Sequence, residues 1–309
     1  MMADYILSGE SPMDIPYSRF EERDIPVLFY KFEVDGVEYE DVMERSKEKY
    51  EEFYSFIDGG KIPNTSQINQ FTYEEYFRGL LSQGKDLLHI CFGTGMTGSY
   101  NNAVRAAEEL KEEFPDRKIY VVDSYCSSQG FGWLVLMLAD LRDEGKSIDE
   151  VYQWAIDHAH KIHHYFTTDD LKYFWRTGRL SGPAATLGSL LGIVPLMELD
   201  YDGCMQAYGK IRGKKKAIAK LIERAMDYID NGADYDGKMF IGNARNMKDA
   251  ELLKSMLHEA FPKADIEICE IGTIIVSHCG PGVISFYFMG KDRPVHEVVN
   301  HNTRGQAEA

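Results

Sequence analysis

Two apolar runs, each followed by a segment with helical periodicity, occupy the stretch between residues 85 and 160. The apolar runs are residues 87–92 and 119–122, and the helical segments are residues 99–113 and 130–142. Strands that alternate with helices in this way lie parallel, because each helix returns the chain to the end of the sheet from which it started. The sequence therefore predicts a parallel α/β sheet in the N-terminal half.

The pattern changes after residue 160. Strand candidates are residues 162–168, 196–199, 204–208, 238–243, 266–270 and 284–288, and helices are expected from Lys214 onward and over residues 248–261. A chain of 309 residues is longer than one core usually organises. We therefore predict an N-terminal α/β domain over 1–160, a mixed-sheet α/β domain over 161–291 and a polar tail over 292–309, with a ligand cleft between the domains.

Acidic residues outnumber basic ones, with 50 Asp and Glu against 34 Lys and Arg and a formal net charge of −16. Such a surface repels the phosphates of nucleic acids and the anionic face of a membrane. The longest apolar run, residues 131–141, is about half a membrane span. The sequence starts without a basic and apolar leader, and the five cysteines are widely spaced. We therefore expect a cytoplasmic protein with reduced thiols and no stable membrane insertion.

Gly93, Gly95 and Gly98 form a G-x-G-x-x-G pattern between a predicted strand and a predicted helix. In dinucleotide-binding proteins these glycines let a pyrophosphate approach the start of the helix, and an acid after the next strand binds the ribose. Asp123 stands at that position. One interpretation is an NAD-dependent oxidoreductase, and the other is a tight turn whose hydroxyl groups cap the helix and line a cleft.

Metal binding and covalent catalysis have weak support in the sequence. The histidines that lie closest together in the sequence are His158, His160, His163 and His164. Their spacing does not place three metal ligands on one helical face. Cys279 follows His278 directly, and neighbours in an extended chain point to opposite faces, so the two do not form a nucleophile and base. No G-x-S-x-G elbow is present. We expect no metal and no cofactor.

Six segments distributed over most of the chain carry a resemblance to a known family. They are PNTSQ at 63–67, TGMTGSY at 94–100, VDS at 122–124, LKYFWRTGRLS at 171–181, RGKKKA at 212–217 and HCGPG at 278–282. Each segment is short, but their order and spacing together resemble the DegV family of fatty-acid-binding proteins. In that family the position of the G-x-G-x-x-G pattern is occupied by a serine-rich turn and binds no nucleotide.

The resemblance implies a carrier without enzymatic activity of its own. In the family two α/β domains enclose one long-chain fatty acid in a tunnel, and an ATP-dependent fatty-acid kinase converts the bound carboxyl group to an acyl phosphate. By this resemblance Thr65, Ser66, Thr94 and His278 would bind the carboxyl group. The protein is expected to act as a monomeric carrier. From the residues alone, Thr65 and Ser66 could equally cap a helix or form a turn, and His278 could stabilise a turn.

Two departures from the family pattern affect the head-group site. The family's N-terminal Thr-Asp-Ser signature appears here only as Ser8-Gly9-Glu10-Ser11. The usual Ser-Ser of the turn is Gly93-Thr94, so one potential hydrogen-bond donor for the carboxyl group is missing. We therefore expect the head-group geometry to differ in detail from the family pattern.

Affinity for an acyl chain requires a dry tunnel, because burying about 16 carbons provides on the order of 10 kcal/mol. Residues 184–195 offer small and branched apolar side chains for its wall, and ordinary core packing is the alternative. The residues expected at the tunnel or the domain junction are Gly95, Met96, Ala184, Leu187, Leu191 and Ile193.

Because the chain is acidic overall, clusters of basic residues on it are candidate contact sites for a partner protein. Arg176, Arg179 and Arg212, with the lysines at 214–216 after the last of them, are candidates for docking the kinase. Alternatively they are solvated surface charges, or Arg176 and Arg179 hold the two domains together.

Overall fold

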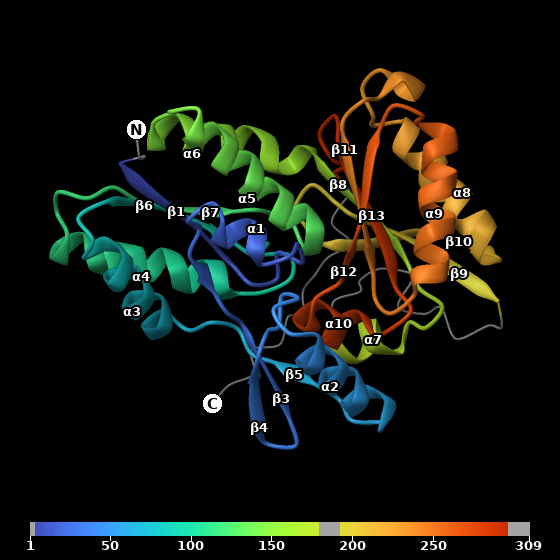
Figure 1. The fold of residues 1–309 in the computed structure, drawn as a ribbon, viewed down its shortest axis with the longest axis horizontal. Coiled ribbons are helices and arrows are strands. Elements are labelled where there is room, and N and C mark those ends of the chain that lie inside the picture. The colour runs from blue at the N-terminus through green and yellow to red at the C-terminus, as the bar shows by residue number, and fades with distance from the viewer. Residues whose placement is uncertain (1–3, 179–191, 296–309) are drawn as a thin grey trace.

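The computed structural model describes residues 4–178 and 192–295 and has three sheets (Figure 1). The first sheet has the order β2-β1-β6-β7 and is parallel throughout. Its strands are β1 (Tyr5–Glu10), β2 (Val27–Leu28), β6 (Asp86–Cys91) and β7 (Ile119–Asp123). The prediction of a parallel N-terminal sheet is therefore confirmed.

Helices cover both faces of this sheet (Figure 1). They are α3 (Gln70–Leu81) and α4 (Ser99–Glu113) on one face, and α5 (Ser128–Asp143) and α6 (Ile148–His158) on the other. The short α1 (Ser18–Glu21) follows β1. The start of α6 is fixed by a capping box, in which Ser147 accepts from the backbone of Glu150 and the Glu150 side chain accepts from Ser147.

The second sheet is mixed and has the order β10-β9-β8-β13-β11-β12. Its strands are β8 (Ile162–Thr167), β9 (Ile193–Leu199), β10 (Met205–Arg212), β11 (Lys238–Asn243), β12 (Asp265–Glu270) and β13 (Ile284–Met289). Only β11 and β12 pair in parallel, and α8 (Lys214–Met226) and α9 (Met247–Ala260) pack against the sheet. The mixed C-terminal sheet is confirmed. The predicted boundary near residue 160 falls in the 3-10 turn η1 (Ala159–Lys161), and a second such turn is η3 (Gly232–Asp234).

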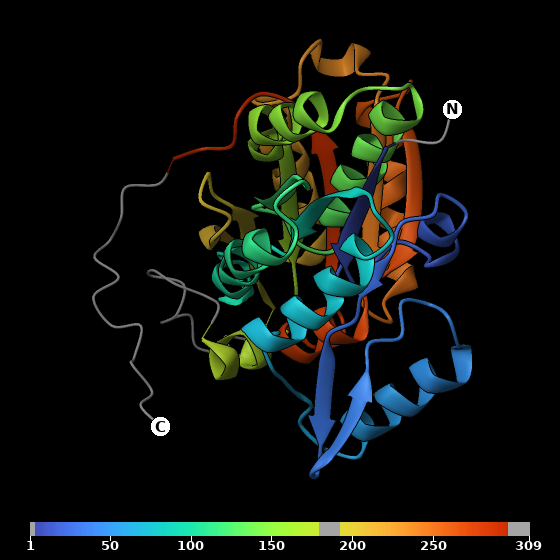
Figure 2. The same cartoon turned by 90° about the vertical axis from the view of Figure 1, so that its left-hand side faces the viewer.

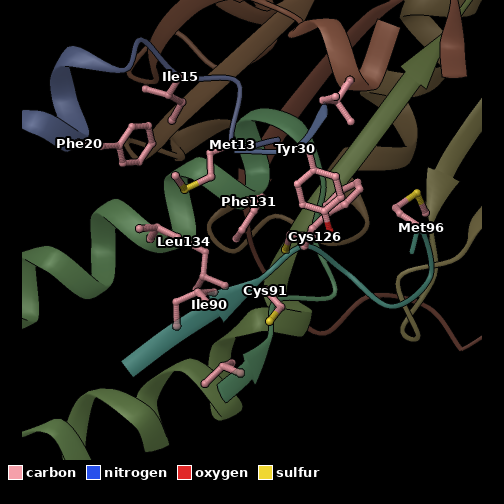
Figure 3. Close-up of a cluster of buried hydrophobic side chains, with 14 of the residues drawn as sticks. Met13, Ile15, Phe20, Tyr30, Ile90, Cys91, Met96, Cys126, Phe131 and Leu134 are labelled. Carbon is pink, nitrogen blue, oxygen red and sulfur yellow. The ribbon is translucent and has the colours of Figure 1, made fainter. Parts of the chain in front are cut away.

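Helix α5 lies between the two sheets and contacts β1 on one side and β8, β11 and β13 on the other. Its glycines make this possible. A Cβ at Gly130 would lie 2.4 Å from His164 Nε2 of the second sheet, and a Cβ at Gly132 would lie 2.1 Å from the Met13 carbonyl oxygen. Figure 3 shows Phe131 of this helix inside the buried cluster that includes Met13 and Ile90. The two halves thus share one hydrophobic core across η1.

The third sheet, β4-β3-β5, was not foreseen (Figure 2). It consists of β3 (Lys31–Val34), β4 (Val37–Glu40) and β5 (Asn64–Thr65), with α2 (Lys47–Asp58) between the last two strands. Asp35 and Gly36 both have positive φ, 52° and 82°, and form the two-residue hairpin turn between β3 and β4. Residues 27–34 thus contribute to two strands in different sheets, and α2 begins at Lys47.

The third sheet meets the C-terminal half through α10 (Thr273–Cys279), which contacts β3 and β5, while α7 (Lys172–Thr177) packs on α10. Helix α10 was also not foreseen. His278 and Cys279 were expected in an extended chain or a turn, and the structure corrects this by placing both in the last turn of the helix. Within residues 4–178 and 192–295 no helix is both long and apolar enough to cross a bilayer.

The hairpin turn between β9 and β10 contacts the turn after β6 at Gly95. A Cβ at Gly95 would lie 2.0 Å from the carbonyl oxygen of Gly203, and Gly203 itself has a φ of +73°. Backbone atoms cannot move aside as a flexible side chain can. Gly95 therefore sets how closely the two halves of the chain approach each other.

We predict that Gly95→Ala lowers the free energy of unfolding by about 1–3 kcal/mol, because the added methyl group pushes the β9–β10 turn away. Gly79→Ala in α3 is the matched control, since a Cβ at Gly79 meets no atom within 4 Å. The control is expected to stabilise by about 0.5–1 kcal/mol through helix propensity. Urea unfolding measures both values, and equal behaviour of the two variants would contradict the close approach at Gly95.

Candidate functional site

A cavity of about 190 Å³, here called the head chamber, opens where the three sheets meet. It is lined by Tyr30, Thr65, Ser66, Gln67, Phe92, Met96, Thr97, Gly98, Ser127, Met205, Ile274, Ile275, His278 and Cys279. The lining residues come from both halves of the chain and include no Lys, Arg, Asp or Glu among the described residues. The chamber is thus mainly apolar, and its polar groups are hydroxyl, amide and imidazole.

Thr65 and His278 are brought together at the edge of the head chamber. Thr65 Oγ1 lies 2.6 Å from His278 Nε2 in a hydrogen bond. Pairing of Thr65 with Phe32 in the third sheet fixes the first side chain, and the last turn of α10 carries the second. These residues are 213 positions apart in the sequence, and the predicted head-group residues Thr65, Ser66 and His278 all line one cavity.

The loop that follows β5 is tied to the start of α4. The Ser99 hydroxyl accepts from Ile68 N at 3.1 Å, and the Asn102 amide donates to Ile68 O at 2.8 Å. This attachment holds Ser66 and Gln67 next to Gly98, where a Cβ would lie 2.7 Å from Gln67 Oε1. The start of α4 therefore faces the protein's own loop.

A second, smaller cavity of about 40 Å³ adjoins the head chamber and is here called the tail chamber. Ser127, Met205, Ile275 and Cys279 line both chambers. The other residues of the tail chamber are Ser128, His164, Phe166, Phe174, Leu199, Ile271, Val283, Ser285 and Tyr287. The two chambers adjoin at the domain junction. The sequence analysis missed most of their lining, because these residues lie far apart in the chain and only the fold brings them together.

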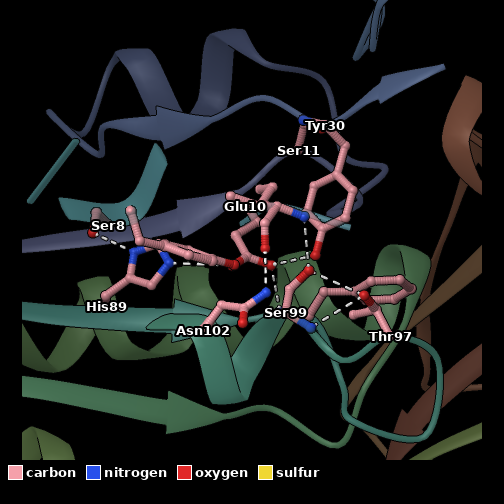
Figure 4. Close-up of polar contacts among 11 residues, drawn as sticks. Ser8, Glu10, Ser11, Tyr30, His89, Thr97, Ser99 and Asn102 are labelled. Carbon is pink, nitrogen blue, oxygen red and sulfur yellow. Dashed lines mark hydrogen bonds and ion pairs between the residues drawn. The ribbon is translucent and has the colours of Figure 1, made fainter. Parts of the chain in front are cut away.

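A buried polar network lies behind the head chamber at the end of β1 (Figure 4). Glu10 is fully buried and accepts from Phe92 N at 2.8 Å, from the Tyr30 hydroxyl at 3.3 Å and from the Tyr73 hydroxyl. His89 Nε2 lies 3.3 Å from Glu10, and its other ring nitrogen bonds Ser8. The altered N-terminal signature thus orients Tyr30, a lining residue that no sequence motif marks.

Glu10, His89 and Cys91 are close enough for a metal site, since one ligand atom from each lies within 4.8 Å of the others. The donors already described occupy both oxygens of Glu10. Burial, with Glu10 nearby, holds the pKa of the Cys91 thiol well above its usual value, which disfavours the thiolate that binds metals. The arrangement fits a structural hydrogen-bond network better than a metal centre.

Thr94, which was predicted to bind the carboxyl group, contacts Asp123 in the structure. Its hydroxyl group donates to Asp123 Oδ2 at 2.5 Å and its backbone N–H donates to Asp123 Oδ1 at 3.1 Å, and it does not line the head chamber. Asp123 also accepts from Tyr125 N at 2.9 Å. Its carboxylate therefore stabilises the turn between β6 and α4, and the acid that a ribose would need is already used.

The glycines of the G-x-G-x-x-G pattern are likewise explained by contacts with other residues of the chain. A Cβ at Gly93 would meet Cys126 backbone atoms at 2.9 Å, while Gly95 and Gly98 face Gly203 and Gln67 as described above. Gly93 and Gly95 are thus required by backbone contacts within the chain, whereas at Gly98 the end of the Gln67 side chain could move aside. The NAD-dependent oxidoreductase interpretation is not supported.

The four clustered histidines each bond a different backbone carbonyl group. His158 contacts Trp154, His160 contacts Tyr201, His163 contacts Lys291 and His164 contacts Ile162, at 2.8–2.9 Å. Burial lowers the pKa of His163 to about 3 and holds the pKa of His164 well below its usual value, so both are neutral. Burial also raises the pKa of the Cys279 thiol far above its usual range, which argues against a nucleophile.

Of the remaining predicted residues, Met96 lines the head chamber, whereas Gly95 lies at the hairpin contact. Ile193 opens β9 opposite Arg212 and lines neither chamber. Arg176 and Arg212 are exposed. The predictions for Arg179, Ala184, Leu187 and Leu191 lie outside the described residues.

Comparisons with known proteins agree with this geometry. The sequence model of the family described as "Uncharacterised protein, DegV family" matches residues 9–291. The chain belongs to the DegV family. It is 35% identical over 289 residues to a DegV domain-containing protein of Clostridium perfringens, a match that covers 94% of this chain and 98% of that relative.

Solved structures of fatty-acid-binding DegV proteins share the two-domain α/β fold. The DegV family protein from Thermus thermophilus has a TM-score of 0.81 at 25% identity and covers 93% of this chain and 99% of its own. The fatty-acid-binding DegV protein from Streptococcus agalactiae has a TM-score of 0.80 at 26% identity, with the same two coverages. The prediction of a DegV fold is therefore confirmed for this chain.

We predict that Thr94→Val lowers the free energy of unfolding of this DegV protein by about 1–3 kcal/mol, because Asp123 loses a buried hydrogen bond. Thr94→Ser is the control, since it keeps the hydroxyl group and should unfold close to the wild type. Denaturant titration measures both. A Thr94→Val variant as stable as the serine variant would show that the hydroxyl group does not stabilise the turn.

Proposed function

We propose that this DegV protein binds one long-chain fatty acid, with its carboxyl group at Thr65, Ser66 and His278 and its acyl chain running from the head chamber toward the tail chamber. The observation that carries the proposal is the Thr65–His278 pair at the edge of an apolar cavity formed by both halves of the chain. The fatty-acid-binding relatives with the same fold support it.

The chemistry of the lining suits such a ligand. Apolar contact with about 16 carbons is worth on the order of 10 kcal/mol, so affinity can come from the chain alone. A buried carboxyl group must still find hydrogen-bond donors, and Thr65 and His278 can supply them. Because the described lining contains no Lys or Arg, the carboxyl oxygen is not held in a strong ion pair. Such binding leaves the oxygen able to react.

The protein would act as a monomeric, cytoplasmic carrier that presents the carboxyl group to an ATP-dependent fatty-acid kinase. Arg176 supports this role, because its guanidinium group lies 3.5 Å from the carbonyl oxygen of Ser277, directly next to His278. Arg212 is exposed at the end of β10. Both residues, together with Arg179, are proposed to dock the kinase. The carrier itself needs neither a cofactor nor a metal.

Substitution of Thr65 by Val tests the head-group assignment, because Val keeps the volume and removes the hydroxyl group. If Thr65 binds the carboxyl group, affinity for palmitic acid should fall about tenfold to a hundredfold, which corresponds to roughly 1–3 kcal/mol. Affinity for hexadecanol, which has no carboxylate, should change much less. Displacement of cis-parinaric acid measures both affinities.

His278→Ala should act in the same direction, and its effect should not add to that of Thr65→Val if both side chains hold one carboxyl group. Equal weakening of acid and alcohol by Thr65→Val would mean that the hydroxyl group only shapes the β5 loop, and the carboxyl site would have to lie elsewhere.

Arg212→Ala tests the docking role. We expect unchanged fatty-acid content and a several-fold lower rate of acyl-phosphate formation by the kinase, because rim charges act mainly on association. Arg105→Ala is the matched control, because Arg105 is also exposed but lies on α4, which packs on the first sheet and carries none of the proposed docking residues. A fall in lipid content that parallels the loss of phosphorylation, or an equal effect of the control, would rule the docking role out.

A further inference from the structure

Five polar residues meet where α5, the third sheet and the start of α10 come together, and we call them the junction cluster. They are Asp14, Asp41, Ser128, Gln129 and Thr273, and all five are buried. Asp14 precedes α1 and Asp41 follows β4, whereas Ser128 and Gln129 open α5 and Thr273 opens α10. None of them belongs to the proposed carboxyl site.

The orientation of the Gln129 amide is fixed by its neighbours. Its nitrogen lies 2.9 Å from the carbonyl oxygen of Asp14 and 2.8 Å from that of Glu270. Carbonyl oxygens only accept hydrogen bonds, so the NH₂ group must face them. The amide oxygen Oε1 therefore points the other way, where it lies 2.8 Å from the Ser128 hydroxyl.

The Ser128 hydroxyl group then lies between two oxygens, Gln129 Oε1 and Asp14 Oδ2, with the latter only 2.5 Å away. A hydroxyl group has one hydrogen to donate. The amide oxygen carries no hydrogen, so Ser128 donates to Gln129, and the hydrogen between Ser128 and Asp14 must belong to Asp14. Both contacts are satisfied only when the Asp14 carboxyl group is protonated.

The surroundings of Asp14 favour the same state. Thr273 donates to Asp41 Oδ1 at 2.6 Å, and a Cβ at Gly272 would lie 2.2 Å from Asp14 Oδ1 and 3.7 Å from Asp41 Oδ1, so the two carboxyl groups converge at the start of α10. The titratable groups that face Asp14 are Asp41, Glu44, Tyr50, Cys279 and Tyr287. None is a cation, and Arg45 acts on Asp41.

Burial and the nearby Asp41 raise the pKa of Asp14 to about 8, although hydrogen bonds with Ser128 and with the Gly272 backbone oppose the shift. Burial also raises the pKa of Asp41, though hydrogen bonds from Thr273 and Ser11 oppose the shift. The backbone is strained at the same place, since the non-glycine residues Asp14, Met43, Glu44 and Ser128 have φ between 30° and 58°. Such strain persists only where surrounding contacts hold it, and it is often found at functional sites.

We propose that the junction cluster is a proton-binding site, in which Asp14 holds a proton at neutral pH, and that loss of this proton releases the start of α10. Ionised Asp14 would place two like charges side by side in a dry environment and would leave the Ser128 contact without its hydrogen. Because Ile274, Ile275 and His278 of α10 line the head chamber, deprotonation would weaken binding there. This second step rests on the proposed function.

The proton site is tested without any ligand by the ¹³C resonance of the Asp14 carboxyl group, assigned by comparison with Asp14→Asn. A titration midpoint near 8 is expected, and a midpoint below about 5 would overturn the proposal. If the asparagine variant does not fold, Asp41→Asn provides the second test, because removal of the like charge should lower the Asp14 midpoint.

Unfolding in urea across pH 5–9 gives an independent readout. A raised folded pKa means that stability is lost as pH rises from the usual carboxyl range toward 8, with an unfolding constant that grows by up to about tenfold per pH unit. Asp14→Asn should lose this dependence. Asp157→Asn, at an exposed position on α6, should keep it. A slope that is the same in Asp14→Asn and wild type would contradict the site.

The link to the head chamber has its own test. If fatty acid binds only the protonated junction, the dissociation constant for cis-parinaric acid should rise up to about tenfold per pH unit above the midpoint in wild type and stay flat in Asp14→Asn. By reciprocity the ligand should raise the Asp14 midpoint. Binding that is equally pH-dependent in both proteins would overturn the link, whereas absence of binding in both at every pH would refute the proposed function and leave the proton titration standing.

Discussion

The packing of α5 between two sheets is the constraint on which the rest of the structure depends. A helix can be covered on both sides this closely only where its side chains are absent, and Gly130 and Gly132 provide the gaps for His164 and for the Met13 carbonyl oxygen. With α5 fixed, the carboxyl ends of β6 and β7 face the second sheet, and the head chamber lies in the angle between them. The cavity is therefore a consequence of how the two halves share one core.

The absence of charged side chains from the described lining is as informative as the residues that are present. An arginine would hold a carboxylate through two strong hydrogen bonds. In the proposed function, threonine, serine and histidine would give weaker, more adaptable bonds, while the apolar wall would supply most of the binding free energy. Such a lining suits the proposed carrier role, in which the ligand would be held tightly by its chain and loosely by its carboxyl group.

The sequence was sufficient for the parts of the fold with long, regular periodicity. The helix over 99–113 and the strands of the parallel sheet lie where the pattern placed them, since amphipathic helices and buried runs carry many residues of signal. Short elements were missed. Strand β5 has two residues and α10 has seven, so their place in the fold is set by tertiary contacts.

The residues of the candidate site also fall into two groups, those that a sequence motif marked and those that only the structure shows. Thr65, Ser66, Met96 and His278, which all line the head chamber, were selected because their short motifs resemble a family. No periodicity would have joined residues 213 positions apart. Tyr30 and Ile275 carry no motif and appear only when α10 is placed against the third sheet. Thr94 was assigned to the carboxyl group by the same resemblance, but the sequence does not reveal that its hydroxyl group bonds to Asp123.

The G-x-G-x-x-G pattern shows why a motif must be read together with what approaches it. A glycine reports only that some atom comes close to the backbone, and a pyrophosphate and a peptide carbonyl group make the same demand. At Gly93 and Gly95 of this chain the approaching atoms belong to the backbone of Cys126 and Gly203, so glycine is required there before any ligand is considered. The same turn that could have received a nucleotide instead brings the β9–β10 hairpin to the edge of the head chamber, where Met205 at the start of β10 becomes part of its wall.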